Sequence, residues 1–162
     1  MNNISIPNLL SVSRVGLGIF YAWSVIHSMW YTAVTVLWIA ILTDILDGFL
    51  ARRQGLTSPL GGLLDHGSDA FFVTCGLIAL FFHGWAPIAL AVIVPLAFAQ
   101  YVLDSSSLKG HPLRSSQLGR YNGICYFILA GFPIMQHALD ITLLPFNLFQ
   151  CIGWGLVLTT AI

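Results

Sequence analysis

The stretch from Asp44 to Asp69 reads DILDGFLARRQGLTSPLGGLLDHGSD and joins two long apolar segments, at about 32–50 and 63–83. Its central part, 53–60, is polar and contains Gly, Thr, Ser and Pro, which favour a turn. We therefore predict two consecutive helices that fold back on each other. Four of the six acidic residues of the chain, all of them Asp, fall within this stretch.

The composition of the whole chain indicates a membrane protein. Of the 162 residues, 57% are hydrophobic and only 7% are charged, and the mean hydropathy is +0.87. A soluble domain has about 25% charged residues, so this chain has too few charges to cover a soluble globule. Disorder is excluded by the high hydrophobicity. Six Lys and Arg balance six Asp, so there is no basic face for nucleic acid.

The apolar segments are continuous and separated by short polar breaks, which favours membrane-spanning helices over barrel strands. We predict an all-α membrane protein, a bundle of six transmembrane helices in a single domain, 1–162. An N-terminal interfacial segment precedes Pro7, where the first helix is expected to start. The six predicted spans are 9–27, 32–50, 63–83, 85–103, 118–137 and 143–162.

The positions of the basic residues predict the orientation in the membrane. Arg52 and Arg53 follow the second span, and Lys109, Arg114 and Arg120 surround the break between the fourth and fifth spans. Because basic residues gather on the cytoplasmic side, both termini and the Asp-rich stretch are expected there. We expect an integral protein of a bacterial inner membrane with its active site facing the cytoplasm.

Helical spacing places the acidic residues on two facing surfaces. On the first helix two acids share a face with two small residues, and this set is Asp44, Asp47, Gly48 and Ala51. On the second helix the residues at i, i+4 and i+8 are Gly61, Asp65 and Asp69. The turn between the helices allows the two faces to meet. His66 is rotated about 100° from Asp65, so we expect it to face away from the acids.

Four carboxylates near a membrane need compensating charge, because intramembrane charges are costly. Two divalent cations would neutralise them, and oxygen ligands favour Mg²⁺ or Mn²⁺ over zinc. Two such ions can clamp a phosphoryl group during transfer. Arg52 adds donors that suit a phosphate. A divalent-cation carrier that uses the same acids is the alternative from a different class, and a magnesium-dependent prenyltransferase is a further one.

The fixed residues of this stretch match the pattern D-x2-D-G-x2-A-R-x8-G-x3-D-x3-D, so the chain resembles the CDP-alcohol phosphotransferase family. The resemblance implies a six-helix membrane fold, commonly dimeric. It also implies that a CDP-linked substrate gives its phosphoryl group to an alcohol and releases CMP. By the same resemblance Asp44, Asp47 and Asp65 hold one metal ion, while Asp47, Asp65 and Asp69 contribute to a second. Asp69 is the implied base, and the residues implied to contact CDP are Gly48, Ala51, Arg52 and Gly61.

Two further segments bear on the lipid substrates. Residues 6–14, IPNLLSVSR, resemble the opening of bacterial phosphatidylglycerophosphate synthases and related cardiolipin synthases, which implies CDP-diacylglycerol as donor. Residues 116–123, SQLGRYNG, resemble their S-x-x-G-K-x-K-T element, but Asn122 replaces the second basic residue. Glycerol-3-phosphate is the preferred acceptor. Phosphatidylglycerol, serine, inositol phosphate and an amino-alcohol stay open because of this missing charge.

Four basic residues are candidates for binding an acceptor phosphate: Arg14, Lys109, Arg114 and Arg120. Arg14 has an equally weighted alternative as a topology-setting charge near the membrane surface. Lys109 and Arg114 lie in a polar break, where the same alternative applies.

Overall fold

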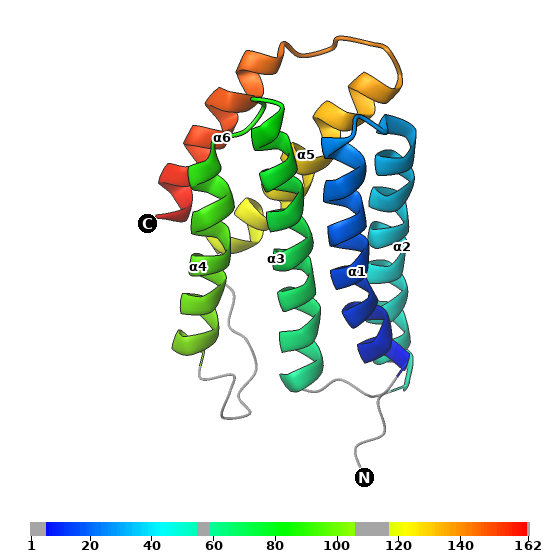
Figure 1. Ribbon diagram of the computed structural model, residues 1–162. Helices are drawn as coiled ribbons and strands as arrows, with labels where there is room; N and C mark the ends of the chain where they lie inside the picture. Colours follow the sequence, from blue (N-terminus) through cyan, green and yellow to red (C-terminus); the bar gives the residue numbers. More distant parts are fainter. Residues whose placement is uncertain (1–5, 55–58, 106–116, 162) are drawn as a thin grey trace.

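The computed structural model describes residues 6–54, 59–105 and 117–161, and within these ranges every regular element is an α-helix (Figure 1). The predicted all-helical fold is therefore confirmed for the described residues. Their helices are α1 (Ile6–Ile26), α2 (Trp30–Gln54), α3 (Pro59–Phe82), α4 (Ile88–Asp104), α5 (Gln117–Ala138) and α6 (Phe146–Thr160).

Three helices in the described residues are long and apolar enough to cross a membrane, with candidate spans Leu9–Ile26, Trp30–Leu50 and Gly61–Phe82 in α1, α2 and α3. The apolar helices α4 and α6 have 17 and 15 residues, whereas a perpendicular span needs about 20. Six membrane crossings therefore stay a prediction.

Prolines shorten two of the predicted helices. Residues Pro87 and Pro145 precede α4 and α6 in extended conformations, with ψ values of 137° and 142°. Both helices consequently start three residues later than the predicted spans at 85 and 143. At the other end of the chain α1 starts earlier than predicted, at Ile6. The expected interfacial segment falls largely on residues 1–5, which lie outside the described residues.

Helix α1 packs against α2 and α3, and α3 also packs against α4 and α5. The approach of α1 to α3 is close, because a Cβ atom at Gly18 would lie 3.1 Å from the Cα atom of Phe72. Tyr21 reinforces this contact: its ring stacks on Phe72 with 5.1 Å between centroids, and its hydroxyl donates to the Ala130 carbonyl at 2.5 Å. This packing fixes α1 beside the acidic part of α3.

Aromatic rings tie the helix connections together at the end of the bundle away from the acids. Trp85, buried in the α3–α4 connection, stacks on Phe146 at 4.6 Å between centroids. Trp30 at the start of α2 contacts both His83 and His137. This end of the bundle is therefore closed by packed side chains.

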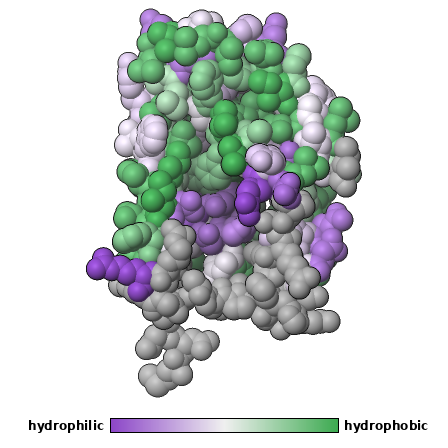
Figure 2. All heavy atoms as spheres, turned by 180° about the vertical axis from the view of Figure 1, so that it is seen from behind, coloured by the Kyte–Doolittle hydropathy of each residue, from purple (hydrophilic) through white to green (hydrophobic). Residues whose placement is uncertain are grey.

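The outer surface is apolar. Large exposed hydrophobic side chains occur on all described helices. One example from each helix, in order from α1 to α6, is Ile19, Trp38, Phe82, Leu96, Ile128 and Leu158. Figure 2 shows hydrophobic residues over most of one face, with hydrophilic residues gathered in its lower half. Because so much exposed apolar surface suits lipid rather than water, the surface and the three long helices point to a membrane protein.

Candidate functional site

All four acids of the predicted site meet around one side chain, Arg14 of α1. The Arg14 Nη1 atom donates to Asp44 Oδ1 at 2.8 Å and also pairs with Asp69. The Arg14 Nη2 atom donates to Asp65 Oδ1 at 2.7 Å and also pairs with Asp47. The acidic faces of α2 and α3 therefore converge as the helical spacing predicts, and α1 supplies a cation between them.

The carboxylate cluster, defined as Asp44, Asp47, Asp65 and Asp69, is buried on one side and open on the other. Arg14 is 1% exposed and Asp47 is 3% exposed, so this ion pair lies inside the helix bundle. The side chains of Asp44, Asp65 and Asp69 are 44%, 31% and 27% exposed. Because burying unpaired charge is costly, the buried carboxylate and guanidinium depend on each other.

Ser11 also contributes to the cluster, and sequence reasoning missed it. Its hydroxyl donates to Asp47 Oδ2 at 3.0 Å, and Ser11 is only 3% exposed. Ser11 and Arg14 are three residues apart, so they share a face of α1. Two polar residues on one face of a mostly apolar helix were the available signal for this contact.

The ligand atoms of the cluster fit a hard divalent cation. Asp44, Asp47 and Asp65 each offer one carboxylate oxygen, and these oxygens lie within 4.8 Å of one another. Such a set contains only oxygen ligands, which Mg²⁺ and Mn²⁺ prefer.

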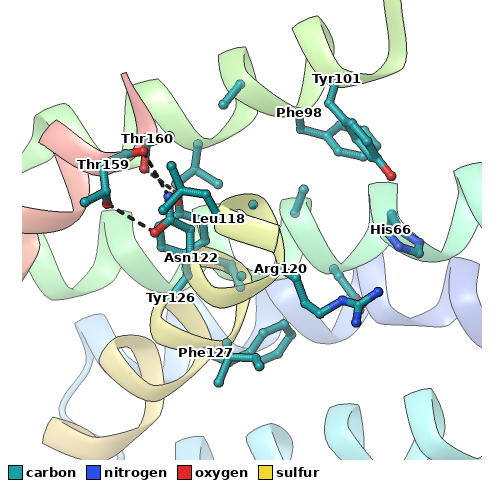
Figure 3. Close-up of a pocket in the computed structure, with 18 of the residues that line it drawn as sticks. His66, Phe98, Tyr101, Leu118, Arg120, Asn122, Tyr126, Phe127, Thr159 and Thr160 are labelled. Atoms are coloured by element: carbon teal, nitrogen blue, oxygen red, sulfur yellow. Dashed lines mark hydrogen bonds between the residues drawn. The ribbon is translucent and has the colours of Figure 1, made fainter. Parts of the chain in front are cut away.

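A cavity of about 1040 Å³ lies next to the cluster, and Asp44 and Asp69 form part of its wall. Residues from α2 to α6 line it, which include apolar Val94 and Phe98 and the polar Arg120. Figure 3 shows Arg120 and Phe98 among the lining side chains. The cavity therefore offers both polar and apolar surface beside the carboxylates.

His66, which is expected to face away from the acids, lies on the wall of this cavity. Its Nδ1 atom is 3.0 Å from the Gly62 carbonyl oxygen and 3.8 Å from Asp65 Oδ2. A rotation of about 100° between neighbouring helical residues does not remove it from a cavity this wide.

Asn122, where the resembling synthases have a basic residue, links α5 to α6. Its Nδ2 atom donates to the Thr159 carbonyl at 3.2 Å, and its Oδ1 atom accepts from the Thr159 hydroxyl at 3.1 Å (Figure 3). Tyr126 and Thr160 form a further hydrogen bond between the same helices. The missing positive charge is therefore replaced by a polar contact between helices.

The other predicted site residues are placed only in part. Arg120 is exposed on the cavity wall, and Gly48 and Gly61 are partly buried on α2 and α3. The side chains of Ala51 and Arg52 lie outside the described residues, as do Lys109 and Arg114. Arg14 lies inside the bundle, among the carboxylates and not on the surface.

Comparison with known proteins finds relatives that include glycerol-3-phosphate phosphatidyltransferases and cardiolipin synthases. A CDP-diacylglycerol–glycerol-3-phosphate 3-phosphatidyltransferase of Pseudomonas fluorescens is 38% identical over 102 residues, which are 56% of this chain and 50% of the relative. A chloroplastic enzyme of the same name in Oryza sativa is 34% identical over 77 residues, 48% of this chain and 23% of the relative. A CMP-forming cardiolipin synthase of Streptomyces coelicolor is 26% identical over 141 residues, 82% of this chain and 65% of the relative.

The chain spans less than two thirds of the length of each of these relatives. The family comparison is more extensive, because the sequence profile described as CDP-alcohol phosphatidyltransferase matches residues 4–162. This match includes all four acids of the carboxylate cluster and the helices that bring them together. The chain therefore belongs to the CDP-alcohol phosphatidyltransferase family.

Proposed function

We propose that the protein transfers a phosphatidyl group from CDP-diacylglycerol to glycerol-3-phosphate and releases CMP. The observation that carries this proposal is the convergence of four carboxylates, two of which, Asp44 and Asp69, form part of the wall of a large cavity with polar and apolar lining. Carboxylates suit metal-assisted phosphoryl transfer, and the apolar lining suits a lipid substrate. The names of the Pseudomonas and Oryza relatives support this donor and acceptor.

In this mechanism the carboxylate cluster would hold two divalent cations, Mg²⁺ or Mn²⁺, which would supply positive charge to the pyrophosphate of the donor. Asp69 takes the proton from the acceptor hydroxyl, and the freed oxygen attacks the phosphorus atom that bears diacylglycerol. The bond from that phosphorus to the bridging oxygen breaks, and CMP leaves with this oxygen. The residues assigned to CDP are Gly48, Ala51, Arg52 and Gly61.

The acceptor phosphate is assigned to the basic residues Arg14, Lys109, Arg114 and Arg120. Of these, Arg120 has the clearest structural support, because it lines the same cavity as Asp44 and Asp69. Phosphatidylglycerol is the main alternative acceptor, supported by the relatives named cardiolipin synthase. Serine, inositol phosphate and amino-alcohols complete the set of acceptors to be compared.

Release of CMP tests the proposed activity. Purified protein is incubated with Mg²⁺ or Mn²⁺, CDP-diacylglycerol and one acceptor at a time, and CMP is measured by chromatography. We expect CMP release that depends on both the metal and glycerol-3-phosphate. Release with phosphatidylglycerol alone would identify the cardiolipin-synthase reaction instead. Metal flux into liposomes without release of CMP would favour the cation carrier.

The membrane arrangement belongs to the same proposal. We place six crossings in a bacterial inner membrane, with the carboxylate cluster on the cytoplasmic side, where CDP-linked substrates and CMP are soluble or accessible. The chain is further proposed to act as a homodimer.

A further inference from the structure

We propose that Arg14 is the resident counter-cation of the carboxylate cluster and that it leaves the cluster when divalent cations bind. The inference rests on the proposed function in one respect, because it takes the cluster as the metal site. It goes further by assigning to Arg14 an exchange with the metal ions.

The contacts of Arg14 place its guanidinium group between all four carboxylates. Each terminal nitrogen pairs with one carboxylate from α2 and one from α3: Nη1 with Asp44 and Asp69, and Nη2 with Asp47 and Asp65. The Arg14 side chain itself is buried, with only 1% of it exposed. One positive charge therefore serves both acidic helix faces at once.

The guanidinium group and a metal ion cannot occupy this position together. The ligand oxygens of Asp44, Asp47 and Asp65 lie within 4.8 Å of one another, and Mg²⁺ binds its oxygens at about 2.0–2.1 Å. The Arg14 Nη1 atom already lies 2.8 Å from Asp44 Oδ1, and Nη2 lies 2.7 Å from Asp65 Oδ1, so an ion bound to the same carboxylates would meet these nitrogens. Steric overlap and like-charge repulsion both require Arg14 to move away.

Arg14 is held in a way that permits this movement. Its Nε atom is buried and has no hydrogen-bond partner among the described residues. The guanidinium group is therefore held only through its two terminal nitrogens, Nη1 and Nη2. An unsatisfied buried donor destabilises the arrangement that contains it. The cost of releasing Arg14 from the cluster is therefore reduced.

Competition between free guanidinium ion and Mn²⁺ tests the exchange. In Arg14→Ala the position of the guanidinium group is vacated, and we expect Mn²⁺ to bind about tenfold tighter or more, equivalent to at least about 1.4 kcal/mol. Free Mn²⁺ is measured by electron paramagnetic resonance, without substrate. Millimolar guanidinium chloride should weaken Mn²⁺ binding to this variant competitively and raise its metal-free melting temperature.

The matched control is Arg53→Ala, which removes an exposed arginine near the end of α2. This variant and the native protein should bind Mn²⁺ equally well and should not respond to guanidinium beyond the effect of NaCl at equal ionic strength. Should Arg14→Ala not fold, Arg14→Lys replaces it, because one ammonium group cannot contact four carboxylates as the planar guanidinium does. We expect Arg14→Lys to bind Mn²⁺ more tightly than the native protein.

Equal or weaker Mn²⁺ binding in the folded Arg14 variant, or binding that guanidinium does not affect, overturns the exchange. The result separates this inference from the proposed function. Competition between guanidinium and Mn²⁺ in the Arg14 variant, with no CMP release by the native protein, supports the exchange and contradicts the transferase activity. Release of CMP without competition supports the transferase activity and contradicts the exchange.

Discussion

Two carboxylates of the cluster, Asp47 and Asp69, differ in environment. Asp47 is 3% exposed and is bound by both Arg14 and Ser11, whereas Asp69 is 27% exposed and lies on the cavity wall. A base must reach its substrate, while a ligand that positions a metal ion benefits from a fixed orientation. The geometry therefore supports Asp69 as the base and Asp47 as a positioned ligand.

The Asp69→Asn variant should lose turnover by at least about 100-fold, since removal of a general base typically costs 10²–10⁴ in rate. Binding of CDP-diacylglycerol should largely survive, as measured by equilibrium binding of a labelled donor. Asp47→Asn and Asp65→Asn serve as comparisons, and both should weaken metal and nucleotide binding together. Near-normal turnover in Asp69→Asn would show that the base is another residue.

The hydrogen bond from Ser11 makes a second prediction at this scale. Ser11→Ala removes a buried donor 3.0 Å from Asp47 Oδ2, and bonds to charged groups contribute about 1.5–3 kcal/mol. We expect a lower melting temperature and weaker Mn²⁺ binding, measured by thermal unfolding and by metal titration in detergent. Ser13→Ala is the control, because Ser13 is exposed and its hydroxyl bonds to the Leu10 carbonyl. Equal effects of the two substitutions would contradict a specific role for Ser11.

The contact between α1 and α3 decides whether Arg14 reaches the acids. Gly18 faces the α3 backbone, whereas a Cβ at Gly16, on the same helix, would meet no atom within 4 Å. The two glycines are only two residues apart, but one lies against another helix and the other faces open space. Their comparison isolates helix packing from helix propensity.

Gly18→Ala should destabilise the protein by about 1–3 kcal/mol, as overpacking of a close contact does. Gly16→Ala should be neutral or stabilise by about 0.5–1 kcal/mol, the usual gain from replacing a helical glycine. Thermal unfolding of both variants in the same detergent measures the difference. A Gly18→Ala protein as stable as Gly16→Ala would contradict close packing of α1 on α3.

At the scale of the whole molecule, the polar and apolar parts are divided along the bundle. The carboxylates lie in the parts of α2 and α3 nearest the polar turn between them, while packed aromatic rings close the end with the α3–α4 and α5–α6 connections. This division agrees with substrates that approach from one side of the membrane only.

Labelling of single cysteines tests the proposed orientation. In a variant without Cys75, Cys125 and Cys151, Leu139→Cys lies in the α5–α6 connection and Arg53→Cys lies near the end of α2; both positions are exposed. A thiol reagent that does not cross membranes should label Leu139→Cys in intact cells, and Arg53→Cys only after permeabilisation. Labelling of both positions from the same side would contradict the proposed orientation.

The sequence by itself determined the helical fold of the described residues, the two acidic faces and the family, because these follow from composition and from spacing within one helix. It placed the helix starts less well where Pro87 and Pro145 delay them. It also predicted that the faces of Asp44 and Asp69 would meet, since a short turn returns the second helix along the first.

Only the tertiary structure decided what lies between those faces. Arg14 is 30 to 55 residues from the acids that it contacts, and Asn122 is 37 residues from Thr159. Such contacts depend on how helices that are distant in sequence pack, and on close approaches such as that at Gly18. The periodicity of a single helix indicates which face is polar, but it does not identify the helix that covers this face or the side chain that enters it.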